Sequence, residues 1–160
     1  YMREAFTVRK ANEKDITLLY TLIQGLAAYE KRPQDMTASQ EALHAWLFQK
    51  KIATALIAEY EQEPVGDAIY YPVFGSFAAE AGVHLEDMYL REESRHGGLG
   101  TKFFAKIVDF VQADGYSGME WSCLDWNKPS IDFYRSLGAV PMDEWTVYRV
   151  TGETLITLAK

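Results

Sequence analysis

A glycine-rich turn is the first stretch of the chain that could do chemistry. Arg95–Gly100 reads RHGGLG and lies between an apolar, strand-like run and an amphipathic, helix-like run. Such a turn places backbone N–H groups at a helix N-terminus, where they and the helix dipole favour a phosphate or pyrophosphate. Gly98 and Gly100 would let a ligand approach the main chain, and Arg95 could add a charged contact. A purely structural turn explains the same pattern equally well.

The spacing of this turn excludes two familiar nucleotide sites. A Walker A loop requires Gly-x-x-x-x-Gly-Lys-Ser/Thr, whereas this chain has Gly100-Thr101-Lys102 with the wrong spacing upstream. A dinucleotide fingerprint follows the first strand of a βαβ unit, whereas this turn comes late, after hairpin-like strands. The pattern that does match is Arg/Gln-x-x-Gly-x-Gly/Ala, at Arg95, Gly98 and Gly100.

Two adjacent carboxylates, Glu86 and Asp87, interrupt the apolar run Val83–Leu90. Successive strand residues face opposite sides, so we expect at most one of the two to face the core or a cleft. The same alternation puts His84, Glu86 and Met88 on one face. An unpaired buried carboxylate is costly, so a charge here needs a partner or a role. Glu86 is either a solvated group on an edge strand or the group that takes a proton from an amine, directly or through water.

Composition narrows the class of protein. The 160 residues carry a formal net charge of -7 without a basic cluster, which argues against a nucleic-acid partner and slightly favours cationic ligands. Cys123 is the single cysteine and lies in an apolar run, so we expect an inert thiol and no intrachain disulfide. The three histidines lack metal-ligand spacing, so no metal is expected. Without a signal-peptide pattern or a membrane-spanning run, a cytoplasmic protein without a membrane partner is expected.

The elements that must position these residues follow from hydrophobic periodicity and capping signals. We expect a single domain over 1–160, with a mixed α/β sheet and helices on its faces. The predicted helices cover about 12–30, 37–47, 101–115 and 129–138. The predicted strands cover 6–10, 54–60, 67–74, 83–90, 119–126 and 145–150, with a turn over 61–66 and a last short strand or helix over 154–158.

The chain resembles the GCN5-related N-acetyltransferases (GNAT), whose pyrophosphate loop has the glycine pattern found here. Within that superfamily it is most similar to the spermidine/spermine (diamine) and thialysine N-acetyltransferases. The resemblance implies a mixed, mostly antiparallel central sheet that splays at the acetyl-CoA site, with helices on both faces. The matching segments, which occur in family order, are 26–30, 85–87, 95–100 and 126–134 followed by Gly138-Ala139.

The same resemblance assigns residues to the acetyl donor, acetyl-CoA. The main chain of Met88, Tyr89 and Leu90 is expected to pair with pantetheine, and an N–H there to polarise the thioester carbonyl. Tyr134 matches the tyrosine that protonates the leaving thiolate, although from its type alone it could equally be a core aromatic. Asn127 is expected to cap a helix, to bind the pantetheine or phosphate region, or both. The predicted pyrophosphate loop consists of Arg95, His96, Gly97, Gly98, Leu99, Gly100 and Thr101.

The acceptor implied by the resemblance is a small cationic amine: a polyamine, a diamine or a lysine-like amino acid. Carboxylates and aromatic rings suit such a molecule through ion pairing and cation–π contacts. The residues placed at the amine are Tyr29, Glu30, Glu86, Glu144 and Trp145. Phe77 stands roughly where the family has a substrate-side tryptophan, and the stretch before Trp145 is shorter, so the sequence does not identify the amine.

Other functions remain open at this point. The same fold could acetylate a protein lysine or N-terminus, or it could serve as a non-catalytic acyl-CoA-binding module. The resemblance also implies a homodimer in which C-terminal segments meet. No covalent acyl-enzyme is needed for direct attack of the amine in a ternary complex, which agrees with an inert Cys123.

Overall fold

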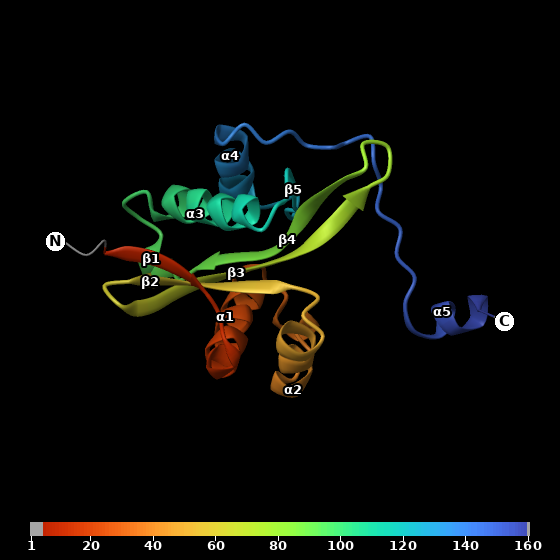
Figure 1. Cartoon of the computed structure of the whole chain (residues 1–160), viewed down its shortest axis with the longest axis horizontal. Coiled ribbons are helices and arrows are strands. Elements are labelled where there is room, and N and C mark those ends of the chain that lie inside the picture. Colours follow the sequence, from red (N-terminus) through yellow and green to blue (C-terminus); the bar gives the residue numbers. More distant parts are fainter. Residues whose placement is uncertain (1–4, 160) are drawn as a thin grey trace. The chain divides into compact units, whose positions relative to one another are not determined.

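The computed structural model of the protein describes residues 5–159, and Figure 1 traces them from strand β1 to helix α5. The chain divides into two compact units, with the boundary between Ser122 and Cys123. The first unit holds the sheet and helices α1, α2 and α3. The second unit holds helices α4 and α5. The expectation of one acetyltransferase domain over 1–160 stays a prediction.

The sheet of the first unit is mixed and mostly antiparallel, as predicted. Its strand order is β1-β2-β3-β4-β5. Strands β1 to β4 pair with one another in antiparallel fashion, and β5 runs parallel to β4. The strands are β1 Phe6–Lys10, β2 Thr54–Tyr60, β3 Glu63–Gly75, β4 Glu80–Leu90 and β5 Met119–Glu120.

Helices cover both faces of this sheet, which is again the predicted arrangement. Figure 1 shows α1 and α2 on one side and α3 on the other. The helices of the first unit are α1 Ile16–Tyr29, α2 Gln40–His44 with its π-helical continuation Ala45–Gln49, and α3 Leu99–Ala113. Within residues 5–159 none of the helices is long and apolar enough to span a bilayer.

Local signals in the sequence explain where these helices begin and end. Asn12 and Asp15 form a reciprocal capping box ahead of α1. Ser39 caps α2 by accepting a hydrogen bond from the Ala42 amide. Gly115, with a φ of +95°, follows the end of α3 in the left-handed region that glycine adopts without strain.

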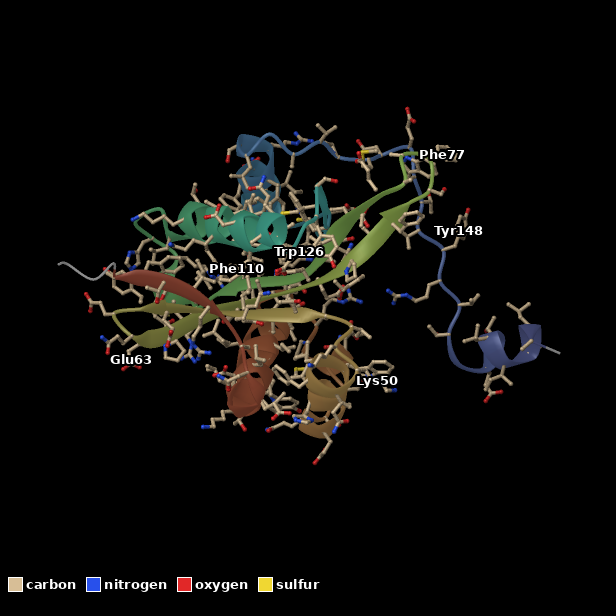
Figure 2. The ribbon with its side chains drawn as sticks, in the orientation of Figure 1. Lys50, Glu63, Phe77, Phe110, Trp126 and Tyr148 are labelled. Carbon is tan, nitrogen blue, oxygen red and sulfur yellow. The ribbon has the colours of Figure 1, made fainter. Side chains whose placement is uncertain are left out.

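Two apolar cores lie on opposite faces of the central strands. Because side chains alternate along β2, Leu56 packs on the α3 side and Ile57 on the α1 side, and both are fully buried. The α3-side core includes Phe103 and Ile107, and Figure 2 shows Phe110 of the same helix at its margin. The α1-side core is built on Leu19 and Leu22.

The pairing of β3 with β4 contains a bulge at Glu86. Ile69 pairs with Asp87 and the next residue, Tyr70, pairs with Leu85, so Glu86 is the extra residue on β4. Such a bulge breaks strict alternation and turns a side chain toward a new direction. A second irregularity follows near Gly66, where a Cβ atom would lie 2.2 Å from the backbone oxygen of Tyr89. Only glycine fits that contact.

The second unit differs most from the prediction. Its helices are α4 Lys128–Ser136 and α5 Gly152–Leu158, so 154–158 is helical. The strand predicted over 145–150 is wrong, because the structure gives this stretch no strand partner. A strand needs a neighbour to satisfy its backbone groups, and an apolar alternating pattern alone does not supply one. Figure 2 shows Tyr148 standing out from this extended segment.

Two further predictions in the first unit need correction. The strand predicted over 119–126 is only two residues long, at β5. The turn predicted over 61–66 is a two-residue turn at Glu61 and Gln62, both with positive φ, and β3 begins at Glu63. Pro64 is tolerated in the strand because a bulge on β2 and β3 lies beside it. Gly66 therefore serves close packing and is not a turn residue.

The close approach at Gly66 yields the first testable prediction. Gly66→Ala places a methyl group against the Tyr89 carbonyl, so the strands must separate, and we expect a loss of about 1–3 kcal/mol in the free energy of unfolding. Urea unfolding followed by circular dichroism measures this loss. Gly75→Ala in the same strand is the control, since its nearest atom would be an ordinary 3.8 Å away. Equal effects of the two variants would contradict the prediction.

Candidate active site

The glycine turn forms an open cradle at the start of α3. Gly97 and Gly98 have φ values of +66° and +75°, and an added Cβ at either would meet no atom within 4 Å. Gly98 is the N-cap of α3, no side chain caps the helix, and its first turn holds no acidic residue. The Leu99 N–H donates a 3.4 Å hydrogen bond to the His96 carbonyl, and the helix dipole at this end favours an anion. Such a turn would suit a phosphate or pyrophosphate group.

Arg95 lies at the edge of this cradle, and its side chain is directed toward α1. Its Nε donates a hydrogen bond of 2.7 Å to the carbonyl of Leu90. Its guanidinium lies over two rings, 4.4 Å from the centroid of Tyr29 and 5.3 Å from that of Tyr89. Arg95 thus ties the donor turn to the end of α1, and a direct phosphate contact would require it to leave these rings.

Strand β4 leaves part of its edge without a strand partner. β5 pairs only with Val83 and His84, so Met88, Tyr89 and Leu90 extend beyond it. This is the splay that the predicted fold requires, and unpaired main-chain groups on a strand edge suit an extended, amide-containing ligand such as pantetheine. One of these groups, the Leu90 carbonyl, is occupied by Arg95.

Three carboxyl groups gather where α1 ends above β4. Glu30 is the C-cap of α1, and Glu86 and Asp87 lie on β4. His84 contacts Glu86 through Nε2 at 3.6 Å and Glu120 through Nδ1 at 3.6 Å. His84 also stacks on Tyr71, with 5.2 Å between ring centroids.

The bulge overturns the prediction about which side chains share a face. Met88 packs against the α3-side core, whereas Asp87 pairs with Ile69 of the α1-side core. Glu86 contacts His84 and interacts electrostatically with Asp87 and Glu30. His84 and Glu86 therefore belong together, as predicted, but Met88 faces the other way. Both carboxylates of the Glu86-Asp87 pair are turned toward the α1 side.

Burial and the charges of neighbouring carboxylates raise the pKa values of Asp87 and Glu30. Desolvation, followed by the charges of Glu86 and Glu30, raises the pKa of Asp87 to about 7. Burial, and then the charge of Glu86, raises the pKa of Glu30, which Arg32 partly offsets. A carboxyl group that titrates near neutral pH is suited to accept a proton from a substrate.

Four of the residues predicted for the site, Asn127, Tyr134, Glu144 and Trp145, lie in the second unit. Asn127 is buried and caps α4, its Oδ1 accepting a hydrogen bond of 3.3 Å from the Ser130 amide, so the predicted capping role is confirmed. Tyr134 lies on α4, with its ring 5.7 Å from that of Phe133. Glu144 and Trp145 lie in the extended segment after α4, and Trp145 is exposed. Phe77, in the first unit, stands exposed at the tip of the β3–β4 hairpin (Figure 2).

Sequence reasoning assigned no role to Asp87 and did not single out Asp67. Strict alternation would place Asp87 on the opposite face of the strand from Glu86. The bulge in the observed pairing places both side chains on the same side of the sheet. Asp67 is the first residue of the strand predicted over 67–74. A single carboxylate directly before an apolar run is the signal that could have indicated an unusual buried group. Within residues 5–159, no three His, Cys, Asp or Glu side chains group closely enough to hold a metal ion.

Comparisons with known proteins agree with the fold. The profile of the Acetyltransferase (GNAT) family matches residues 19–139, so the chain belongs to that family. It is an acetyltransferase, and acetyl-CoA is the co-substrate of the family. The chain is 32% identical to the thialysine N-epsilon-acetyltransferase of Sus scrofa and 33% identical to that of Bos taurus, covering 95% of this chain and 96% of each relative. An integron cassette protein from the mobile metagenome of V. cholerae shares the fold, with a TM-score of 0.79 at 20% identity over 99% of both chains.

The raised pKa of Asp87 predicts how stability changes with pH. An unfolded aspartate titrates near pH 4, so between about pH 4 and 7 unfolding releases a proton from Asp87. Its contribution to the free energy of unfolding is complete below about pH 4 and is lost as the pH rises to about 7. Asp87→Asn removes this loss, so its Tm relative to the wild type should rise steadily from pH 4 to pH 8.

Thermal denaturation in steps across that pH range measures the difference. Asp109→Asn is the control, because Asp109 is exposed on α3, on the opposite side of the sheet. A difference in Tm between Asp87→Asn and the wild type that stays constant with pH would contradict the assignment.

Proposed function

We propose that the protein transfers the acetyl group of acetyl-CoA to a primary amine of a small cationic substrate. The observation that carries the proposal is the convergence of Glu30, Glu86 and Asp87 at the end of α1, next to Tyr29. The charge of Glu86 raises the pKa values of Asp87 and Glu30, and a substrate ammonium group would supply positive charge that favours their ionised forms. The relatives named thialysine N-epsilon-acetyltransferase support this, since their name describes acetylation of an amine.

The acceptor would be a polyamine, a diamine or an amino acid with a lysine-like side chain. Its ammonium group would pair with Glu86 and Asp87, and Tyr29, whose ring lies against the Arg95 guanidinium, would line the site beside them. Glu30 would neutralise a second positive charge on a longer substrate. Glu144 and Trp145 are the residues that we propose for the distal part of the amine.

The acceptor must lose a proton before it can attack, because an ammonium nitrogen has no lone pair. One proton passes to Glu86 through water, or to Asp87, and then to solvent. The amine nitrogen then forms a bond to the acetyl carbon in a ternary complex, and the carbon–sulfur bond breaks. The leaving thiolate takes a proton from the Tyr134 hydroxyl. The nitrogen loses its second proton as the amide forms, and this proton, directly or through solvent, restores the Tyr134 hydroxyl.

The donor side of the proposal uses mainly backbone atoms. The cradle of Arg95–Thr101 would bind the pyrophosphate, and β4 would pair with pantetheine along Met88–Leu90. A backbone N–H of that edge would stabilise the developing oxyanion. Asn127, whose Oδ1 caps α4, would contact the pantetheine or phosphate region.

Two other functions are distinguished by experiment. A protein lysine or N-terminal acetyltransferase would modify peptides in preference to free amines. A non-catalytic acyl-CoA-binding module would bind acetyl-CoA without releasing thiol. The homodimer and the cytoplasmic location expected from the family resemblance stay predictions.

The proposed cradle can be tested with two glycines at opposite ends of α3. Gly98 and Gly115 both have positive φ and open space around an added Cβ, so alanine at either should cost about 1 kcal/mol of stability. Only Gly98→Ala disturbs the cradle. We expect it to raise the KM for acetyl-CoA about tenfold and to reduce the rise in Tm that acetyl-CoA produces, whereas Gly115→Ala leaves both unchanged. Equal effects would argue that the glycines form only a turn.

The amine can be tested with a substrate panel. Spermidine, spermine, putrescine, thialysine and lysine are each supplied with acetyl-CoA, and free thiol is measured over time. We expect at least one of these amines to cause release of free thiol. We expect Tyr134→Phe to lower kcat about 10²-fold or more, because the leaving thiolate loses its proton donor. If none of the five amines causes thiol release but a lysine peptide is acetylated, the protein-acetyltransferase alternative replaces the small-amine proposal.

A further inference from the structure

Asp67 is a buried carboxyl group for which the fold supplies no partner. The residue is 0% exposed, and within residues 5–159 neither Oδ1 nor Oδ2 has a hydrogen-bond partner. An ionised carboxylate cannot be kept in such surroundings, so the group takes up a proton, and burial raises its pKa well above the usual value. A protonated carboxyl group is a strong hydrogen-bond donor, and leaving that donor unused is itself costly.

The strand register places Asp67 beside the acceptor site. Asp67 pairs with Tyr89 on β4, and Ile69 pairs with Asp87. Paired residues on antiparallel strands face the same side, so Asp67 and Asp87 are diagonal neighbours on the α1 side of the sheet, within reach of side-chain rotation or one bridging water. After the larger effect of burial, the charge of Asp87 also raises the pKa of Asp67.

The elements packed around Asp67 bring few groups that could compete for its proton. Opposite it on β2 lies Ile57, and α1 contributes Leu19 and Leu22. Arg9 on β1 is engaged by Asp15 and Glu59. The titratable or charged groups on the elements around this face include Arg9, Asp15, Tyr20, Tyr29, Glu30, Glu59, Tyr71, His84, Glu86, Asp87, Tyr89 and Arg95.

Among these groups Asp87 is the one that the register sets diagonally beside Asp67 and that also belongs to the acceptor site. The burial of the three carboxyl groups increases inward: Glu86 is exposed, Asp87 is half-buried and Asp67 is fully buried. Asp67 therefore stands behind Asp87, on the side away from an incoming amine.

We propose that Asp67 is a positioning residue of the acceptor site, whose carboxyl O–H donates a hydrogen bond to the Asp87 carboxylate, directly or through one water. This bond would keep Asp87 ionised at neutral pH, in the form that binds and deprotonates the ammonium group. Asp67 itself keeps its proton and does not touch the substrate. The inference rests on the proposed function for its consequence in catalysis, although the hydrogen bond can be tested in the free protein.

Two substitutions of similar size separate this role from a structural one. Asp67→Asn keeps a hydrogen-bond donor, whereas Asp67→Leu removes it and relieves an unsatisfied buried polar group. We expect both variants to fold, and Asp67→Leu to have a Tm at or above that of the wild type. The acid limb of the kcat/KM profile should move up by about one pH unit in Asp67→Leu, which is roughly a tenfold loss at pH 6 and less than twofold at pH 9. Asp67→Asn should restore the wild-type profile.

A titration of the ligand-free protein provides the second measurement. Aspartate carboxyl carbons labelled with ¹³C are followed by NMR from pH 4 to 9, with Asp87→Asn identifying the Asp87 signal and Asp109→Asn as the control. The Asp87 midpoint should rise by about one pH unit in Asp67→Leu and remain in place in Asp67→Asn. An unmoved midpoint in Asp67→Leu, or the same shift in both variants, would overturn the inference. If wild-type protein acetylates no amine while the midpoint moves as expected, the proposed function fails and the hydrogen bond stands.

Discussion

The pairing of β3 with β4 is the constraint on which the first unit depends. Gly66 brings the two backbones so close that no other residue fits, and a few residues further along the bulge at Glu86 resets the alternation. The result is that two successive carboxylates reach the same side of the sheet, beneath the end of α1. Without the bulge one of them would point into the apolar core under α3, where an ionised group is not tolerated. The acidic character of the acceptor site is therefore a property of strand register.

A second connection links the donor and acceptor halves of the first unit. Arg95 belongs by sequence to the glycine turn, yet its guanidinium rests on Tyr29 and Tyr89 and its Nε holds the Leu90 carbonyl. One cation thus contacts the strand before the turn and the helix that carries the acceptor carboxylate Glu30.

Much of this architecture could be predicted from residue patterns, and the exceptions have physical causes. The helices α1, α3 and α4 carry capping residues and terminal glycines that act locally, so their bounds were predictable within a few residues. The bulge at Glu86 arises from the pairing of two strands, which no pattern within one strand reports. Residues 145–150 have the alternation of a strand but no neighbour, and the structure leaves them extended. Asp67 could be noticed as a charge in an apolar run, but its isolation from any partner is visible only when the surrounding elements are in place.

The edge strand β1 and the unpaired edge of β4 differ in how readily a strand from another molecule could pair with them. The edge strand β1 carries Arg9 and Lys10, which are held by acidic partners, and such charges discourage a second strand from adding. Beyond Val83 and His84, the edge of β4 that faces away from β3 has no strand neighbour among residues 5–159. An extended edge of this kind is a template for any passing β-strand, including one from another copy in a concentrated solution. A ligand that pairs with Met88–Leu90 would occupy the same groups, so the co-substrate would protect the protein against aggregation as well as take part in its chemistry.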